Sequence, residues 1–165
     1  MDSAVTDWAV ISLGNHFRGD DSVGPYLLHR LREKLGDSVD CIENGGDMTR
    51  LLEDWTRRRV CLVDAIMAHG RQAGDIIRLN GLAEAMPASV CTTSSHGLNL
   101  AEAIELGRVM GALPLQLDIY GICGENFTTS AALSPAVEAA AAKVEQEILK
   151  SLMTQTGGPP CTSNP

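Results

Sequence analysis

The chain has 165 residues, a formal net charge of −8 at pH 7, 44% hydrophobic residues and 21% charged residues. This composition fits one globular domain with a substantial core, and the negative charge disfavours a nucleic-acid partner. No apolar run approaches the roughly 18 to 20 residues that span a bilayer. The N-terminus has acids where a signal peptide needs bases, so we expect a cytoplasmic protein with no membrane association.

Short apolar runs alternate with helical patterns along the chain. The run WAVISL at 8–13 predicts a buried strand that ends at Gly14. The remaining strands are predicted at 38–43, 60–66, 75–79 and 115–123, and helices at 23–35, 48–57, 97–110 and 135–152. The strand at 75–79 follows a Gly-bounded connection that could form a hairpin. The basic TRRR motif at 56–59 predicts the solvated end of a helix.

The predicted helices have apolar stripes and recognisable end signals. Gly36 stops the first helix, and Ser134 with Pro135 begins the last one. The residues expected to face the core are Leu27, Leu28, Leu31 and Leu35 in the first helix, Leu51, Leu52 and Trp55 in the second, and Val137, Ala141, Val144, Ile148 and Leu152 in the last.

This alternation predicts an α/β fold, a three-layer sandwich in which a mostly parallel, five-stranded twisted sheet has helices on both faces. One domain is expected over residues 1–153, followed by a disordered tail at 154–165. In such sheets ligands bind beyond the carboxyl ends of the strands, which directs attention to the polar residues there.

Three acids and one histidine stand at these ends. Asp20 and Asp21 follow the first strand, Asp64 terminates the third, and His96 precedes the third long helix. The paired acids and His96 could also act as helix caps, whereas a buried Asp64 must be paired, protonated or metal-bound. Two carboxylates and an imidazole suit a divalent ion such as zinc or nickel, with coordination positions left open.

The sequence lacks the motifs of several common enzyme classes. The sequence has no G-x-S-x-G, H-E-x-x-H, G-x-G-x-x-G or Walker loop. Its five cysteines are spread singly, which argues against a structural zinc site, and none lies beside a histidine as a nucleophile would; they are Cys41, Cys61, Cys91, Cys123 and Cys161. Cys41, Cys61 and Cys123 are expected to be small core residues.

The segment GNHFRGDDSVG at 14–24 resembles the opening of the hydrogenase maturation endopeptidases. Further matches follow in the same order over residues 8–152: Asp64-Ala65 at the end of the third strand, His96-Gly97-Leu98, Gly121-Ile122 and Leu133-Ser134-Pro135. The resemblance implies an endopeptidase, a hydrolase that removes a C-terminal extension from the large-subunit precursor of a nickel-iron hydrogenase after nickel insertion. The nickel in the substrate would serve as the recognition element.

The resemblance also implies roles for individual residues. Asp21, Asp64 and His96 match the metal-ligand positions and are the candidate catalytic residues. Asp20 would cap the helix or shape the loop. The candidate substrate-binding residues are Asn15, Asp20, Gly45, Gly46 and Asp47, although the turn at 44–47 could equally be an ordinary glycine turn.

No permanently bound cofactor is expected, because nickel arrives with the precursor; zinc or cadmium could occupy the same ligands. The protein is expected to act as a monomer. Hydrolysis could be metal-assisted or could use a carboxylate as general base, in the manner of an aspartic protease. Two alternatives stay open: a non-catalytic nickel-docking or chaperone module, and a small-molecule hydrolase with a resident metal.

Overall fold

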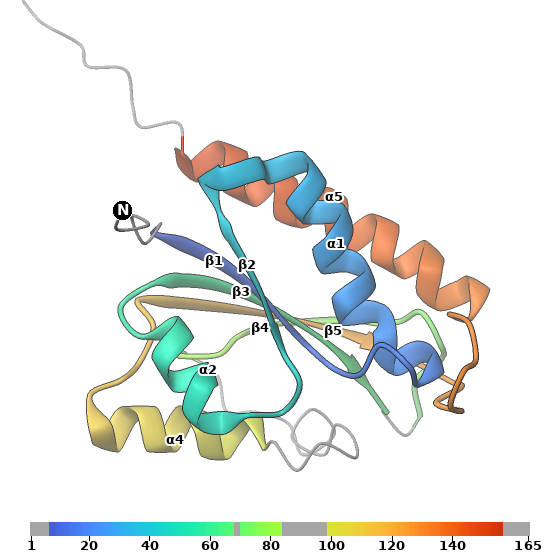
Figure 1. The fold of residues 1–165 in the computed structure, drawn as a ribbon, viewed down its shortest axis with the longest axis horizontal. Coiled ribbons are helices and arrows are strands. Elements are labelled where there is room, and N and C mark those ends of the chain that lie inside the picture. Colours follow the sequence, from blue (N-terminus) through green and yellow to red (C-terminus); the bar gives the residue numbers. More distant parts are fainter. Residues whose placement is uncertain (1–6, 68–69, 84–98, 157–165) are drawn as a thin grey trace, which may run out of the picture.

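The computed structural model describes residues 7–67, 70–83 and 99–156 (Figure 1). The elements follow one another as β1 (Trp8–Leu13), η1 (Gly19–Ser22), α1 (Val23–Leu35), η2 (Gly36–Ser38), β2 (Asp40–Asn44), α2 (Met48–Trp55), β3 (Arg59–Ile66), β4 (Ile76–Asn80), α4 (Leu100–Met110), β5 (Gln116–Cys123) and α5 (Pro135–Thr156); η1 and η2 are short 3-10 helices. The predicted elements are therefore present, with small shifts at their ends.

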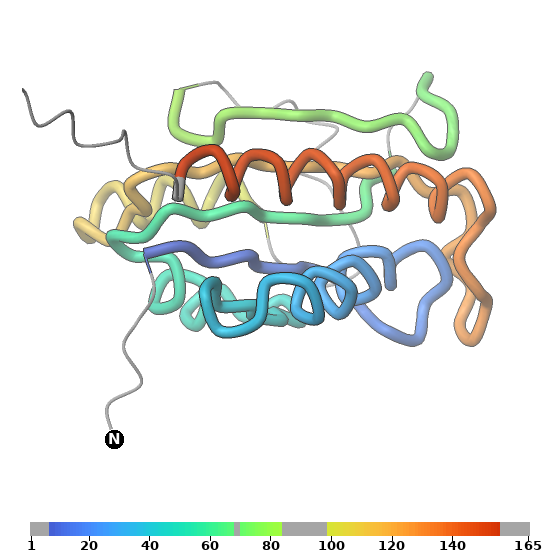
Figure 2. The backbone as a smooth tube through the Cα atoms, turned by 90° about the horizontal axis from the view of Figure 1, so that it is seen from above, coloured from blue at the N-terminus to red at the C-terminus, as the bar shows by residue number. Residues whose placement is uncertain are grey.

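The strands form one sheet in the order β2-β1-β3-β5-β4. Strands β2, β1, β3 and β5 are parallel to one another, and β4 runs antiparallel to β5. The prediction that β3 and β4 could form a hairpin was wrong. Strand β5 lies between them, and β4 forms the edge of the sheet (Figure 2). The reason is burial: β3 is apolar on both faces and suits the centre of the sheet, whereas the half-exposed β4 suits an edge.

Helices cover both faces of the sheet, as expected for a three-layer sandwich. In Figure 1, α1 and α5 lie on one face while α2 and α4 lie on the other. Each face has its own core; one contains Val10, Cys61 and Val63, and the other contains Ile11 and Leu62. The residues predicted to face the core from α1, α2 and α5 are buried, except Leu35, which is partly buried.

Two details differ from the sequence-based expectations. The last helix continues to Thr156, so the first three residues of the predicted tail are helical and the rest lie outside the described residues. Arg58 is buried rather than solvated, because its guanidinium donates to the Trp8 carbonyl and to Asp40 at 2.6 Å. No helix within the described parts of the chain is long and apolar enough to cross a membrane.

A buried carboxylate links the two helices on one face of the sheet. Glu145 of α5 is 1% exposed and accepts hydrogen bonds from Arg30 Nε at 2.6 Å and from Lys34 Nζ, both on α1. Burial by itself would raise the pKa of Glu145, but the two cationic partners lower it below its ordinary value. The ionised form is thus the one that the folded protein favours.

From the contacts of Glu145 with Arg30 and Lys34 we expect a specific pH dependence of stability. Because the folded-state pKa of Glu145 is lowered from 4.5, its contribution is present above about pH 4.5 and is lost as the pH falls further. Glu145→Gln should lower the free energy of unfolding by about 1–3 kcal/mol at pH 7 in urea titrations, and by less at pH 3. Glu138→Gln, at an exposed position on the same helix, is the control; an equal loss at both pH values for Glu145→Gln would contradict this account.

Candidate active site

The loop after β1 folds back on itself because two glycines permit very close backbone approaches. Gly14 has a φ of +120°, and a Cβ atom there would lie 2.3 Å from the carbonyl oxygen of Asp21. At Gly24 a Cβ atom would lie 2.4 Å from the Leu13 carbonyl and 3.2 Å from that of Val63. The glycine spacing recognised in the sequence therefore brings the start of α1 directly against β1 and β3.

Asn15 holds this loop and the carboxylate of Asp21. The Asn15 backbone N–H donates to Asp21 Oδ2 at 3.1 Å, and the Asn15 side-chain oxygen accepts from the Phe17 N–H at 2.9 Å. Asp21 is fully buried in η1. The hydrogen bonds thus show Asn15 as a positioning residue for Asp21, a role that sequence reasoning did not assign to it.

Asp20, next along the chain, belongs to a different set of contacts. Its carboxylate accepts four hydrogen bonds, from the N–H groups of Glu125, Asn126 and Ser134 and from the Ser134 hydroxyl, at 2.7–2.9 Å. Its own N–H donates to the Asn126 carbonyl at 2.7 Å. Asp20 therefore fastens the loop that bears Asp21 to the loop that follows β5.

The environment of Asp20 defines its role. Burial acts to raise the pKa of this carboxyl, but the hydrogen bonds that it accepts lower the pKa below its ordinary value. Asp20 is fully buried, and the hydrogen bonds that it accepts give it a part in shaping the loop; its assignment as a substrate contact stays a sequence-based prediction. The hydroxyl of Ser134, which the local pattern marked only as a helix cap, is one of its donors.

Asp64 lies within β3, two residues before the strand ends, rather than at its end. It is paired with Gly121 of β5 and is 5% exposed. Because side chains alternate along a strand, Asp64 shares the sheet face of Leu62, which is covered by α2 and α4. A carboxylate at this depth is unusual and requires polar or metal partners.

The structure brings the chain segments of the two predicted acidic ligands together. The turn η1, with Asp21, packs against β3, with Asp64, at the carboxyl edge of the sheet. His96 lies outside the described residues. Within the ranges 7–67, 70–83 and 99–156, no group of three or more His, Cys, Asp or Glu side chains could hold a metal ion.

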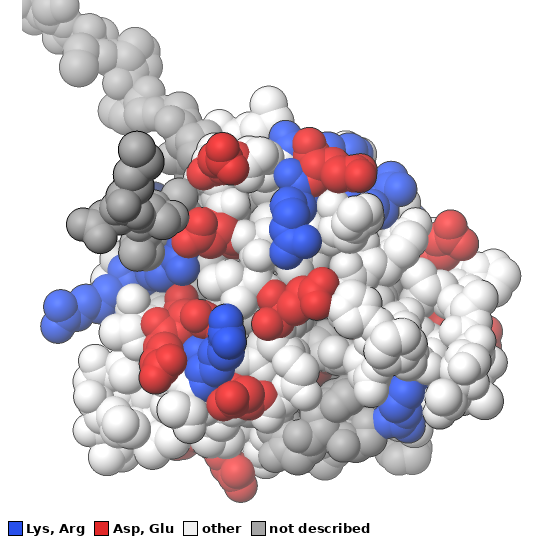
Figure 3. Space-filling view, viewed as in Figure 1, with Lys and Arg blue, Asp and Glu red and all other residues white. Residues whose placement is uncertain are grey.

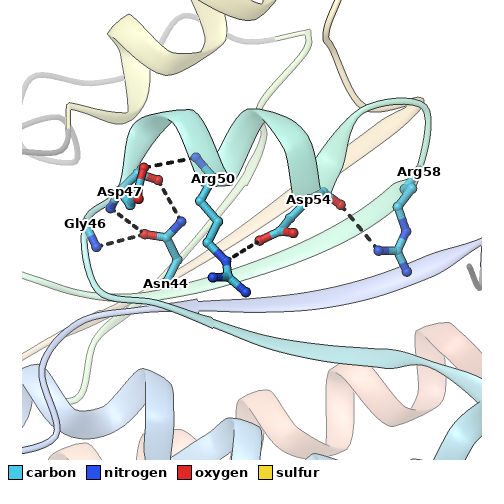
Figure 4. Close-up of polar contacts among 6 residues, drawn as sticks. All are labelled: Asn44, Gly46, Asp47, Arg50, Asp54 and Arg58. Carbon is cyan, nitrogen blue, oxygen red and sulfur yellow. Dashed lines mark hydrogen bonds and ion pairs between the residues drawn. The ribbon is translucent and has the colours of Figure 1, made fainter. Parts of the chain in front are cut away.

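The predicted glycine turn after β2 is organised by a buried asparagine (Figure 4). The Asn44 side chain accepts from the N–H groups of Gly46 and Asp47 at 2.8 Å and donates to the Asp47 carbonyl at 2.8 Å. Asp47 in turn caps α2 by accepting from the Arg50 N–H at 3.0 Å. The backbone of Gly45 is exposed, and a Cβ atom there would meet nothing.

The described cysteines are free thiols unsuited to nucleophilic chemistry. Cys61 and Cys123 are buried and Cys41 is partly buried, which confirms the expected core positions of the first two. Burial raises the pKa of Cys61 to about 12 and also raises the pKa of Cys41 and Cys123. Thiolates are the reactive form, so these residues do not suit catalysis.

The fold of this chain is similar to those of solved endopeptidase structures. A solution structure of an endopeptidase from Escherichia coli is 26% identical and has a TM-score of 0.75, over 90% of this chain and 94% of that one. The hydrogenase maturating endopeptidase HybD from the same organism has the same fold, with a TM-score of 0.74 at 24% identity over 91% of this chain and 94% of that one. The class is therefore an α/β endopeptidase.

The family follows from the sequence comparison. Residues 25–151 match the model of the hydrogenase maturation protease family, and the chain belongs to that family. A curated relative, the hydrogenase 2 maturation protease of Escherichia coli (strain K12), is 27% identical over 147 residues, which cover 87% of this chain and 88% of the relative. The expected activity class, a peptidase and hence a hydrolase, is confirmed, and a purely non-catalytic docking module is disfavoured.

Proposed function

We propose that this peptidase removes the C-terminal extension of a nickel-iron hydrogenase large-subunit precursor after nickel insertion, with the substrate's nickel as the recognition element. Membership of the hydrogenase maturation protease family supports the substrate class. The observation that carries the site is the meeting of two segments with buried aspartates, η1 with Asp21 and β3 with Asp64, at the carboxyl edge of neighbouring strands.

Under this proposal Asp21, Asp64 and His96 engage the nickel of the precursor. The two carboxylates supply oxygen ligands and the imidazole a nitrogen ligand, a set that leaves coordination positions for groups of the substrate. His96 enters the proposal on the family resemblance alone. Engagement of the nickel fixes the position of the scissile peptide bond, and positioning of this kind contributes on the order of 7 kcal/mol or more in well-oriented reactions.

Hydrolysis then requires a water molecule to attack the peptide carbonyl carbon, with the C–N bond breaking and a proton passing to the leaving amine. The water is activated either by the metal or by one carboxylate acting as general base. Asn15 supports both routes because its N–H holds Asp21 Oδ2. We propose Gly45, Gly46 and Asp47 as contacts for the substrate tail, because Asn44 holds their backbone in an exposed turn.

In this scheme the metal arrives with the substrate, so the protein needs no resident cofactor, although zinc or cadmium in excess could occupy the same ligands. A monomeric state and a cytoplasmic location stay sequence-based predictions. Metal analysis of dialysed protein distinguishes the scheme from a hydrolase with its own metal: a stoichiometric ion that survives dialysis would favour the latter.

The decisive experiment mixes the purified protein with nickel-loaded and nickel-free forms of a cognate precursor. We expect a shortened product, identified by mass spectrometry, from the nickel-loaded form only. Asp21→Asn should abolish this product, whereas Asp37→Asn, at an exposed position in η2, should not. Equal cleavage of both forms would contradict recognition through nickel, and cleavage of neither would overturn the proposed function.

A further inference from the structure

An aromatic side chain projects into solvent from the loop that carries Asp21. Phe17, one of only two phenylalanines in the chain, is 73% exposed. Burial of a phenylalanine side chain stabilises a fold, and an exposed Phe17 does not contribute that stabilisation in the isolated protein. By contrast Phe127, the other phenylalanine, is partly buried against the core.

The exposure of Phe17 does not come from a loose loop. Its N–H donates to the Asn15 side chain at 2.9 Å, and its carbonyl accepts from the Ser130 N–H at 2.7 Å. The backbone is therefore fixed on both sides of the ring, by its own loop and by the loop that follows β5. A side chain presented from a rigid backbone loses little conformational freedom when it binds, which favours a role as an anchor.

Polar groups border the ring on one side. The His16 ring lies 6.2 Å from the Phe17 ring between centroids, and His16 Nε2 lies 2.7 Å from Glu43 Oε2 at the end of β2. This hydrogen bond links the loop to the neighbouring strand. An apolar centre with a polar rim is the arrangement found where a few residues dominate the binding energy of protein interfaces.

A second exposed apolar side chain marks the same edge of the sheet. Met67 directly follows β3 and is 54% exposed. Exposed apolar residues therefore follow both β1, which precedes the loop with Asp21, and β3, which contains Asp64. On the face drawn in Figure 3 charged side chains gather over the middle and left, and few lie at the right-hand end, where the loops after β1 and β5 lie in Figure 1. On this face, charged side chains are therefore sparse at the end of the molecule that carries Phe17 (Figure 3).

We propose that Phe17 is a docking anchor that inserts into an apolar pocket on the folded body of the precursor. The inference rests on the proposed function, because the partner is the proposed substrate. Phe17 stands four residues before Asp21 on the segment between β1 and α1, so one segment would carry both the anchor and a proposed nickel ligand. The ring projects from a backbone held by two hydrogen bonds, so its complement is a concave apolar pocket, which a folded protein offers and a short extended tail does not.

Phe17→Ala should raise KM for the nickel-loaded precursor on the order of 30-fold, the size typical of an aromatic anchor, and leave kcat within about twofold. The dissociation constant for the nickel-free precursor, measured by calorimetry, should rise by a similar factor. Phe17→Leu keeps a large apolar side chain and should raise either constant no more than about fivefold. Val109→Ala removes a similarly exposed residue, 83% exposed at the end of α4, and should change neither constant.

The outcomes separate the two proposals. If the unaltered protein cleaves the loaded precursor and Phe17→Ala leaves KM and the dissociation constant unchanged, the anchor is overturned and the proposed function stands. A fall in kcat with unchanged KM would also overturn it, since that result shows a disturbed Asp21. If no cleavage is seen, the proposed function fails, and the calorimetric comparison still decides whether Phe17 binds the precursor.

Discussion

Replacing Asp64 by asparagine should reduce cleavage of the nickel-loaded precursor at least about 100-fold, as measured by the rate of appearance of the shortened product. The amide cannot act as a general base and is a much weaker metal ligand than a carboxylate, so both mechanistic routes lose this group. The fold should be retained, because asparagine has almost the same size and shape and a neutral amide is less costly to bury than a charge. We expect the free energy of unfolding to change by no more than about 1.5 kcal/mol.

A second aspartate in a central strand provides the matched control. Asp118 of β5 is half-buried and accepts a hydrogen bond from the Gln116 side chain at 2.7 Å, near the opposite end of the strand from the candidate site. Asp118→Asn should leave the cleavage rate within about threefold. Full activity of Asp64→Asn, or an equal loss in both variants, would exclude the assigned role of Asp64.

Asp20→Ala should give the largest loss of stability among the loop substitutions. The change leaves four donors without their acceptor, three backbone N–H groups and the Ser134 hydroxyl, in a fully buried site. Loss of a buried, hydrogen-bonded charge costs about 3–5 kcal/mol, measurable as a fall in the free energy of unfolding in urea. The lowered pKa of Asp20 also means that its contribution is lost as the pH falls below about 3.8, so the difference between variant and unaltered protein should narrow in acid.

Comparison with Asp21 distinguishes a structural role of Asp20 from a role in the cleavage reaction. Asp21→Asn should abolish cleavage and change stability far less than Asp20→Ala. The loop after β5 should exchange its amide hydrogens faster in Asp20→Ala, because the N–H groups of Glu125 and Asn126 lose their acceptor. If Asp20→Ala were as stable as the unaltered protein, the interpretation of Asp20 as a tie between the two loops would be wrong.

Three side chains show why some structural and functional details lay beyond local sequence patterns. Asp20 and Asp21 are chemically identical neighbours ahead of one helix, and either could serve as its cap. Their roles diverge because Asp20 meets residues 105 to 114 positions away, whereas Asp21 is held by Asn15, six positions away. Arg58 likewise follows a helix as if solvated, and only its contact with Asp40 and the Trp8 carbonyl explains its burial.

The sequence by itself determined the alternation of strands and helices, the faces that they bury and the presence of an acid in the third apolar run, because hydrophobic periodicity and end signals act over a few residues. It also carried the ordered motifs of the family. The tertiary structure alone decided that β4 joins the sheet beyond β5, that Asp20 is a structural tie and that the segments of Asp21 and Asp64 meet. These outcomes depend on contacts between distant parts of the chain, which no local pattern encodes.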